Sequence, residues 1–211
     1  MAHGRFITFE GGEGAGKSTQ VRRLAARLEF RGVDVLMTRE PGGSPGAETL
    51  RGLLVTGDAD RWSPMAETLI LYAAREDHLR RTIRPALDAG RWVLCDRFAD
   101  STRAYQGAAG GTDPAFIRAL ENAVVGPTAP DLTLVLDMPA DVGLARAAGR
   151  GEGEARFESK GLAFHQRLRD GFLAVARAEP YRCVVVDAAG DMDAVEQAIW
   201  TAVVARFSDL R

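Results

Sequence analysis

The chain has 211 residues, of which 46% are hydrophobic and 27% are charged; this predicts one folded domain over residues 1–211 and excludes a disordered or fibrous chain. Its 27 basic and 29 acidic residues leave a net charge of −2, so no overall positive field would attract nucleic acid or an anionic membrane. No apolar run approaches the roughly 18 residues of a membrane span, and no apolar signal segment opens the chain, which predicts a cytoplasmic protein.

Five short and nearly continuous apolar runs predict strands buried on both faces, as parallel strands are. In chain order they are Phe6–Phe9, Val33–Met37, Trp92–Cys95, Leu132–Leu136 and Cys183–Val186. Helical stretches separate them, over Ser18–Arg31, over residues 64–89, and from about Asp193, where Asp193 and Glu196 have the spacing of a capping box. This alternation predicts an α/β fold, with a parallel sheet between two layers of helices.

The cysteines and histidines indicate no metal or triad chemistry. Cys95 and Cys183 lie in apolar runs, which predicts reduced core residues. The three histidines are scattered along the chain, so a histidine-based zinc site or catalytic triad is not expected.

The strongest motif is the segment Gly11–Ser18, which fits the pattern G-x-x-x-x-G-K-[ST] and is called the phosphate loop below. It follows a predicted strand and opens an amphipathic helix, as the motif requires. Its backbone N–H groups and the helix N-terminus are expected to cradle phosphates. Lys17, one of only two lysines in the chain, would reach the β- and γ-phosphates of a nucleoside triphosphate, and Ser18 would bind Mg²⁺.

A carboxylate at a strand end is expected to complete the site, and two strands offer one. Asp96 is followed by a dense polar segment, so we expect it to act on Mg²⁺ or on the acceptor phosphate. Asp137 precedes an ordinary helix start, Met138-Pro139, and is expected to be mainly structural.

The class of phosphate-loop protein follows by elimination. Asp187 and Gly190 match the D-x-x-G pattern of switch GTPases, but the guanine-reading N-K-x-D signature cannot exist, because Asn122 is the only asparagine and neither lysine is near it. Motor and transporter ATPases are larger. A small kinase remains.

Three arginines indicate that the kinase acts on an anionic acceptor. Arg39 and Arg97 follow strands, at the sheet edge that faces the ligand crevice, and Arg75 lies in the long helical stretch. Guanidinium groups suit bidentate phosphate recognition. The residues alone leave two alternatives open: a kinase for another small anionic acceptor, such as a different nucleoside monophosphate, and a nucleotide-binding regulatory module that transfers no phosphate.

Four segments resemble the thymidylate kinase family in that family's order: residues 9–19, 38–43, 72–75 and 96–107. The resemblance covers essentially the whole chain. It implies ATP-dependent phosphorylation of dTMP to dTDP in dTTP biosynthesis, with Mg²⁺ as cofactor. It also implies a three-layer phosphate-loop kinase fold with a five-stranded parallel sheet, a mobile lid and a homodimer.

The resemblance also implies roles for individual residues. Glu13 would face the acceptor sugar, Arg39 and Arg97 would hold the dTMP phosphate, and Arg75 would bind the thymine edge. Tyr105 would exclude ribonucleotides, and a strained, cis turn at Glu40-Pro41 would aim Arg39. The ATP site expected from the motif and the family is Gly11, Gly12, Glu13, Gly14, Ala15, Gly16, Lys17, Ser18 and Thr19. The dTMP site is Glu13, Arg39, Pro41, Leu71, Arg75, Arg97, Ser101, Thr102, Tyr105 and Gln106, the metal ligands are Ser18 and Asp96, and the catalytic residues are Lys17, Arg97, Arg150 and Arg156.

The lid is expected over approximately residues 146–158, where glycines alternate with charged residues. The phosphate loop contains no arginine, so the chain resembles the bacterial type of the family, whose catalytic arginine lies in the lid; here that arginine would be Arg150 or Arg156. In one respect the chain departs from the family. Leu71 stands where a phenylalanine usually stacks on thymine, so either Leu71 makes an aliphatic contact or Tyr72 replaces the stacking ring.

Overall fold

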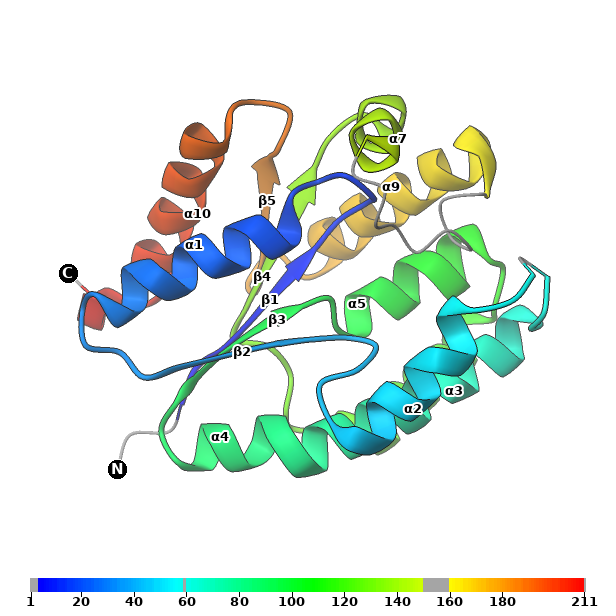
Figure 1. Cartoon of the computed structure of the whole chain (residues 1–211), viewed down its shortest axis with the longest axis horizontal. Coiled ribbons are helices and arrows are strands. Elements are labelled where there is room, and N and C mark those ends of the chain that lie inside the picture. The colour runs from blue at the N-terminus through cyan, green and yellow to red at the C-terminus, as the bar shows by residue number, and fades with distance from the viewer. Residues whose placement is uncertain (1–3, 59, 150–159, 211) are drawn as a thin grey trace.

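Five parallel strands form the central sheet of the computed structural model, which describes residues 4–58, 60–149 and 160–210 (Figure 1). The strands are β1 (Phe6–Glu10), β2 (Val35–Arg39), β3 (Trp92–Asp96), β4 (Leu132–Asp137) and β5 (Cys183–Asp187), in the spatial order β2-β3-β1-β4-β5. All five predicted strands are therefore confirmed, and each extends to a charged residue at its carboxyl end. The second strand begins and ends two residues later than predicted. Its last residue, Arg39, lies opposite Asp96 at the end of β3.

Helices cover both faces of the sheet, so the predicted three-layer arrangement is confirmed (Figure 1). Helices α1 and α10 pack on one face, and α3, α4, α6 and α9 pack on the other. The helices are α1 (Lys17–Glu29), α2 (Pro45–Val55), α3 (Pro64–His78), α4 (Arg84–Asp88), α5 (Ala99–Thr102), α6 (Pro114–Val124), α7 (Ala140–Ala148), α9 (Gly161–Ala178) and α10 (Met192–Arg206). Two π-helical segments, η1 (Leu79–Ile83) and η2 (Arg103–Ala109), and a short 3₁₀ turn, η3 (Ser208–Leu210), complete the described chain.

The alternation of side chains along β1 decides what each face of the sheet receives. Ile7 and Phe9 point into the core beneath α1 and α10. Phe6 points to the opposite face, where its ring meets that of Phe98 at 5.0 Å. Thr8 and Glu10 share that face with Phe6, because they follow it at intervals of two residues. The carboxylate of Glu10 therefore lies buried under the start of α5.

The start of α10 differs from expectation. The N-cap of α10 is Asp191, whose carboxylate accepts hydrogen bonds from the N–H groups of Asp193 and Ala194. The predicted capping box of Asp193 and Glu196 is therefore wrong, because Asp193 already lies in the first turn; Glu196 instead forms an ion pair with Arg23.

The long helical stretch over residues 64–89 consists of α3, η1 and α4 in succession. The π-helical segment η1 begins directly after His78 and ends at Ile83, two residues before Pro85, which is the second residue of α4. Proline has no N–H to donate within a helix, and its ring collides with the preceding turn. A widened turn ahead of Pro85 accommodates both effects.

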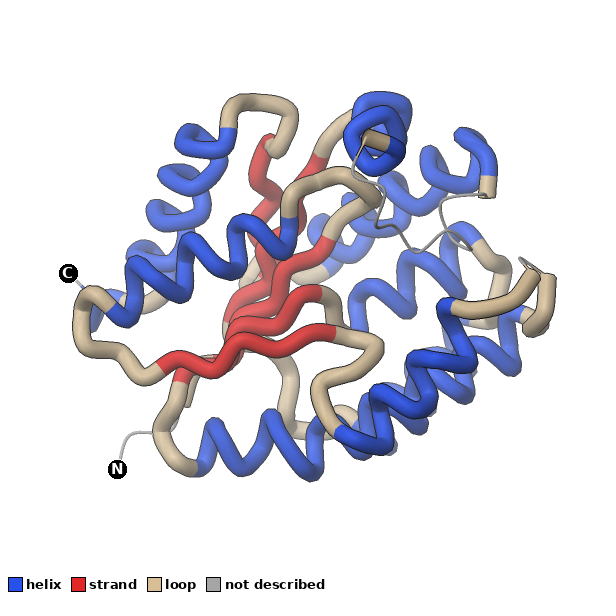
Figure 2. Tube along the Cα trace, viewed as in Figure 1, coloured by secondary structure: helices blue, strands red, loops and turns tan. Residues whose placement is uncertain are grey.

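Both cysteines are free and buried, as predicted. No helix in the described part of the chain combines the length and the apolar character needed to span a bilayer. The loops that follow β1, β2 and β3 all leave the carboxyl edge of the sheet (Figure 2). Because the strands are parallel, this edge gathers the residues that the sequence marked as functional.

Candidate active site

The phosphate loop wraps tightly between β1 and α1. Gly14 has a φ of 69°, and a Cβ atom placed on it would lie 2.0 Å from the carbonyl oxygen of Gly143 in α7. Only glycine permits both this left-handed backbone and so close an approach. Gly16, with a φ of 84°, is the N-cap of α1 and provides no side-chain cap, and the first turn of the helix contains no acidic residue. The first N–H groups of α1 are therefore left for an anion.

Lys17 lies inside this loop. Its Nζ donates hydrogen bonds to the carbonyl oxygens of Gly11 at 3.1 Å and Gly12 at 2.8 Å. Burial, together with the neighbouring charge of Arg97, lowers the pKa of Lys17 to about 8. A bound phosphate would restore full protonation, because an opposite charge in a desolvated site stabilises the ammonium form.

The structure brings the two expected metal ligands together. The Ser18 hydroxyl, at the start of α1, donates to a carboxylate oxygen of Asp96 at the end of β3, over 2.5 Å. A hydroxyl and one carboxylate suit Mg²⁺, which takes few protein ligands and shares the rest of its shell with substrate phosphates and water. Among the described residues, no group of three or more His, Cys, Asp or Glu side chains is arranged to hold a metal.

Beside the phosphate loop lies a second concavity, called the arginine cavity below. It is lined by Glu40, Pro41, Leu54, Leu71, Arg75, Arg97, Phe98, Ser101, Thr102, Tyr105 and Gln106. Most of the residues expected to bind the acceptor are therefore brought to one place, from three elements: the loop after β2, helix α3, and the segment from β3 through η2. Glu40, Leu54 and Phe98 were missed.

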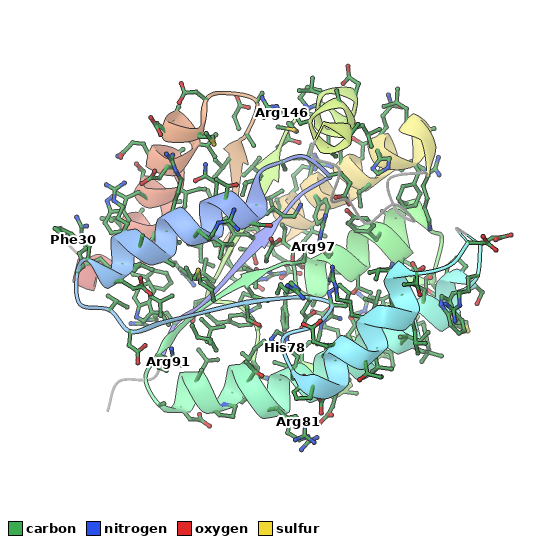
Figure 3. All side chains as sticks on the ribbon, in the orientation of Figure 1. Phe30, His78, Arg81, Arg91, Arg97 and Arg146 are labelled. Carbon is green, nitrogen blue, oxygen red and sulfur yellow. The ribbon has the colours of Figure 1, made fainter. Side chains whose placement is uncertain are left out.

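Arg97 connects the arginine cavity to the phosphate loop, near the centre of the molecule (Figure 3). Its guanidinium donates to the carbonyl oxygen of Gly11 at 2.9 Å and to a carboxylate oxygen of Glu13 at 3.1 Å, and it lies 4.9 Å from the ring centre of Tyr105. Its backbone φ is 70°, the only positive value at a non-glycine residue in the described chain. Strain of this kind concentrates at functional sites, and here it turns the side chain back over the phosphate loop.

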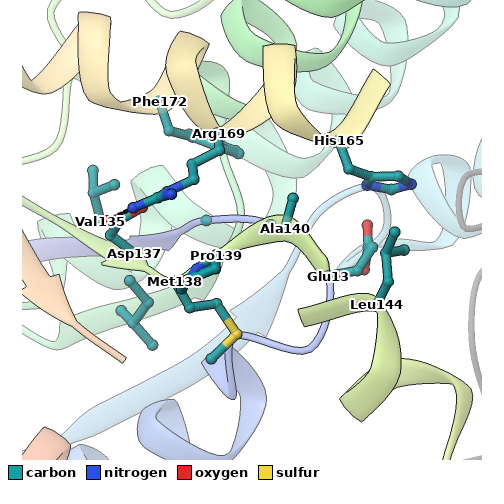
Figure 4. Close-up of a pocket in the computed structure, with 13 residues that line it drawn as sticks. Glu13, Val135, Asp137, Met138, Pro139, Ala140, Leu144, His165, Arg169 and Phe172 are labelled. Carbon is teal, nitrogen blue, oxygen red and sulfur yellow. Dashed lines mark hydrogen bonds and ion pairs between the residues drawn. The ribbon is translucent and has the colours of Figure 1, made fainter. Parts of the chain in front are cut away.

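The carboxylate of Glu13 is bound to two residues that line the arginine cavity. Its carboxylate accepts hydrogen bonds from Arg97 and from the Tyr105 hydroxyl. Burial acts to raise the pKa of Glu13, but the charges of Arg97 and Lys17 outweigh it and hold this pKa at about 2. The side chains of Glu13 and of His165 in α9 point toward one another across a smaller pocket (Figure 4).

Two expected acceptor residues lie outside the lining of the arginine cavity. One is Glu13; the other is Arg39, whose guanidinium is more than half exposed and forms an ion pair with Glu48 at 3.2 Å. The peptide bond between Glu40 and Pro41 is cis. Arg75 lines the cavity, yet its side chain is only 1% exposed and is bound to Glu40.

Leu71 and Tyr72, the two alternatives for contact with the base, lie in different surroundings. Leu71 lines the arginine cavity, whereas Tyr72 is buried in the core beneath the sheet. Of these two residues, it is therefore the aliphatic Leu71 that faces the arginine cavity. Asp137 is held by Arg169 through two hydrogen bonds, at 2.7 and 2.8 Å, which tie α9 to the sheet.

The lid lies mostly outside the described residues, and so do both of its expected catalytic arginines, Arg150 and Arg156. Arg146, at its start, belongs to α7 and donates hydrogen bonds to the carbonyl oxygens of Ala188 and Ala189.

A parallel five-stranded sheet, a phosphate loop at the end of β1 and an arginine-lined cavity beside it define a phosphate-loop kinase with a small acceptor. The family model described as "Thymidylate kinase" matches residues 9–199. The thymidylate kinase of Caulobacter vibrioides is 66% identical, over 98% of this chain and 99% of the relative, and that of Nitrobacter winogradskyi is 54% identical, over 94% and 87%.

A solved structure agrees with these relatives. The crystal structure of thymidylate kinase from Ehrlichia chaffeensis superposes with a TM-score of 0.77 at 35% identity, over 95% of this chain and 98% of that one. The chain belongs to the thymidylate kinase family. It phosphorylates dTMP to dTDP with ATP, in the synthesis of dTTP. The regulatory module and the kinase for another nucleotide, which the residues alone left open, are thereby excluded.

Proposed function

We propose that this reaction takes place across the carboxyl edge of the sheet, with the ATP triphosphate in the phosphate loop and dTMP in the arginine cavity. The observation that carries the proposal is the position of Arg97, which lines the cavity and also binds the Gly11 carbonyl oxygen of the phosphate loop. One guanidinium thus spans the distance between a donor phosphate and an acceptor phosphate.

The ATP site is proposed to act through charge and position. Residues 11–19 would surround the phosphates with backbone N–H groups, and Lys17 would neutralise the β- and γ-phosphates. Mg²⁺, held by Ser18 and Asp96, would supply further neutralisation of phosphate charge. No strong base is required, because the phosphate of dTMP is already largely ionised at neutral pH.

The acceptor site is proposed to hold dTMP in the arginine cavity. Leu71 would pack against the base, and Arg75 would bind its edge, with Pro41, Ser101, Thr102 and Gln106 around them. Tyr105, fixed by its hydrogen bond to Glu13, would lie against the sugar. Arg39 would leave its exposed pair with Glu48 and join Arg97 on the acceptor phosphate; an exposed ion pair of this kind costs little to break.

Arg150 and Arg156 are proposed to complete the site when the lid closes. A positive charge that arrives only with both substrates bound stabilises the transition state without holding the products. We also propose that the protein forms a homodimer and acts in the cytoplasm, where its buried cysteines remain reduced.

The test is a coupled assay of the wild type and the variants Arg97→Ala, Arg150→Ala and Arg156→Ala against a panel of nucleoside monophosphates. We expect dTMP to be the preferred acceptor and Arg97→Ala to weaken its binding. At least one lid variant should lower kcat by about 10³-fold or more with little change in dTMP affinity. Wild-type turnover in both lid variants would show that the lid assignment is wrong.

A further inference from the structure

Arg75 enters the arginine cavity in a fixed orientation. Its Nε donates to Glu40 Oε2 at 2.8 Å, and its Nη2 donates to the Phe98 carbonyl oxygen at 3.2 Å and to Thr102 Oγ1 at 3.0 Å. Its Nη1 is buried and has no hydrogen-bond partner among the residues that the structure describes. Buried donors rarely remain unsatisfied, so Nη1 is the atom of Arg75 left to bind a ligand.

Glu40, which holds Arg75, is itself held on its other oxygen. Glu40 Oε1 lies 3.1 Å from Nδ1 of His78, and Nε2 of the same ring lies 2.7 Å from the Thr38 hydroxyl oxygen. The Glu40 and His78 side chains are 5% and 0% exposed. His78 is the last residue of α3 and lies in the interior of the molecule (Figure 3). A continuous chain of hydrogen bonds therefore runs from Thr38 on β2 to the guanidinium of Arg75.

The chemistry of the donors and acceptors determines which nitrogen of the His78 ring donates and which accepts. A carboxylate only accepts hydrogen bonds, so Nδ1 donates to Glu40; in the neutral ring, Nε2 then accepts from the Thr38 hydroxyl. Gly43 closes the space beside this contact, because a Cβ atom there would lie 2.3 Å from Nε2 and 2.4 Å from the Thr38 hydroxyl oxygen. A side chain at position 43 would therefore collide with the contact between His78 and Thr38.

We propose that Glu40 and His78 are positioning residues that set the nucleobase specificity of the reaction. They hold Arg75 so that Nη1 presents a hydrogen-bond donor to the 4-position of a pyrimidine. Thymine carries a carbonyl acceptor at that position and cytosine carries an amino donor, so a fixed donor favours dTMP over dCMP. This inference rests on the proposed function, in which Arg75 binds the base.

A variant of Asp77, the residue before His78, can distinguish a role in specificity from a role in supporting the fold. Asp77 accepts hydrogen bonds from the Ser44 hydroxyl at 2.7 Å and the Gly46 N–H at 3.1 Å, so it ties the same loop to α3. No hydrogen bond of the described chain joins Asp77 to Arg75. We therefore expect a loop loosened through Asp77 to leave the orientation of Arg75 unchanged, which makes Asp77→Asn a matched control.

The experiment measures kcat/KM for dTMP and for dCMP, and the KM of ATP, in four variants. In Glu40→Gln, the amide group turns a donor toward either Arg75 or His78, both of which are donors. In His78→Gln, the amide reaches the position of Nε2 and loses the contact with Glu40, whereas in His78→Asn it takes the position of Nδ1 and keeps that contact. Asp77→Asn is the control.

We expect Glu40→Gln and His78→Gln to lower the dTMP-to-dCMP ratio by about tenfold or more, the effect of a misdirected hydrogen bond. His78→Asn and Asp77→Asn should keep this ratio within about threefold of the wild-type value, and all four should keep the KM of ATP. If Glu40→Gln or His78→Gln does not fold, Thr38→Val replaces it; this variant removes only the hydroxyl that fixes the ring, and it should also lower the ratio.

An equal fall in kcat/KM for both nucleotides, with the ratio retained, would overturn the inference and show that these residues only support the fold. Arg75→Gln separates this failure from that of the proposed function. If Arg75→Gln keeps the wild-type ratio, Arg75 does not bind the base and the acceptor assignment itself fails. If Arg75→Gln loses the ratio while Glu40→Gln and His78→Gln keep it, only the positioning role fails.

Discussion

Glu10 is a charged residue placed where water does not reach. Its side chain accepts hydrogen bonds from the Phe98 N–H at 2.8 Å and from the Ser101 hydroxyl at 2.5 Å. Burial, together with the nearby charge of Asp100, raises the pKa of Glu10 to about 7. The sequence held a clue to this position, because Phe6, Thr8 and Glu10 follow one another at strand spacing.

The raised pKa makes the stability of the protein depend on pH. A group whose pKa is about 7 when folded, against about 4.5 when unfolded, stabilises the fold fully below pH 4.5 and loses that contribution as pH rises through 7. Glu10→Gln stays neutral throughout. We therefore expect the free energy of unfolding of this variant, relative to wild type, to rise by about 3 kcal/mol between pH 5 and pH 8.

Denaturant unfolding of wild type and Glu10→Gln at several pH values measures this difference. An unchanged difference between pH 5 and pH 8 would contradict the raised pKa, whatever the variant does to stability at a single pH.

Several residues of the site could not be found from the sequence, for a physical reason. Motif spacing locates the residues that we propose to bind phosphate and metal, such as Lys17 and Ser18, because the loop that carries them is continuous in the chain. Leu54, in α2, reaches the arginine cavity only through the packing of separate elements. The ion pair between Glu40 and Arg75 joins residues 35 positions apart, which no local pattern in one sequence reveals.

At the scale of elements, the phosphate loop and α7 fit together through two glycines. A Cβ atom on Gly143 would lie 2.4 Å from the carbonyl oxygen of Glu13, and one on Gly14 would meet Gly143 at 2.0 Å. Because α7 leads directly into the proposed lid, the element that would bring the lid arginines to ATP is packed against the loop that would hold the phosphates.

We expect Gly143→Ala to push the phosphate loop away from its position and to raise the KM of ATP by about tenfold or more, with a smaller effect on dTMP. The matched control is Gly52→Ala in α2, where an added Cβ would have no atom within 4 Å. This control should keep both KM values and stabilise the helix by about 0.5–1 kcal/mol. Equal effects of the two substitutions on the KM of ATP would contradict the close packing.

The strands were easier to predict than the ends of the helices. Buried parallel strands read as short apolar runs, and all five were recognised, with β2 displaced by two residues. The N-cap of α10 was predicted at Asp193 instead of Asp191. Several acidic residues lie near the start of this helix, and only the backbone geometry selects Asp191. The π-helical segments η1 and η2 leave no periodic pattern of their own, although Pro85 marks the first of them.

At the scale of the whole molecule, the order β2-β3-β1-β4-β5 is set by hydrogen bonds between strands distant in the chain. The alternation of elements predicted a parallel sheet but contained nothing that orders its strands. The outer surface of α3 carries Met65 and Leu69, one turn apart and about half exposed. Exposed apolar side chains gathered on one helix face favour a protein partner, which supports the proposed homodimer.

Light scattering should therefore give a mass twice the 22.7 kDa of the chain. Introducing charge at the expected interface, with Met65→Glu and Leu69→Glu together, should yield monomers, because a buried unpaired charge is strongly unfavourable. Phe30→Glu is the control: Phe30 is 90% exposed and lies just beyond the end of α1, far from α3 (Figure 3). A monomeric wild type would refute the proposed homodimer. A dimer that survives the double substitution would show that this face of α3 is not the interface.

The buried amine of Lys17 makes the protein unusually simple to label. Only two ε-amino groups exist in the whole polypeptide, and that of Lys17 loses its proton near pH 8, where an ordinary lysine remains a poor nucleophile. A mild acylating reagent that enters the phosphate loop would attach there, and nucleotide bound at the proposed ATP site would shield it. The mass of one peptide would then report how many molecules hold ATP.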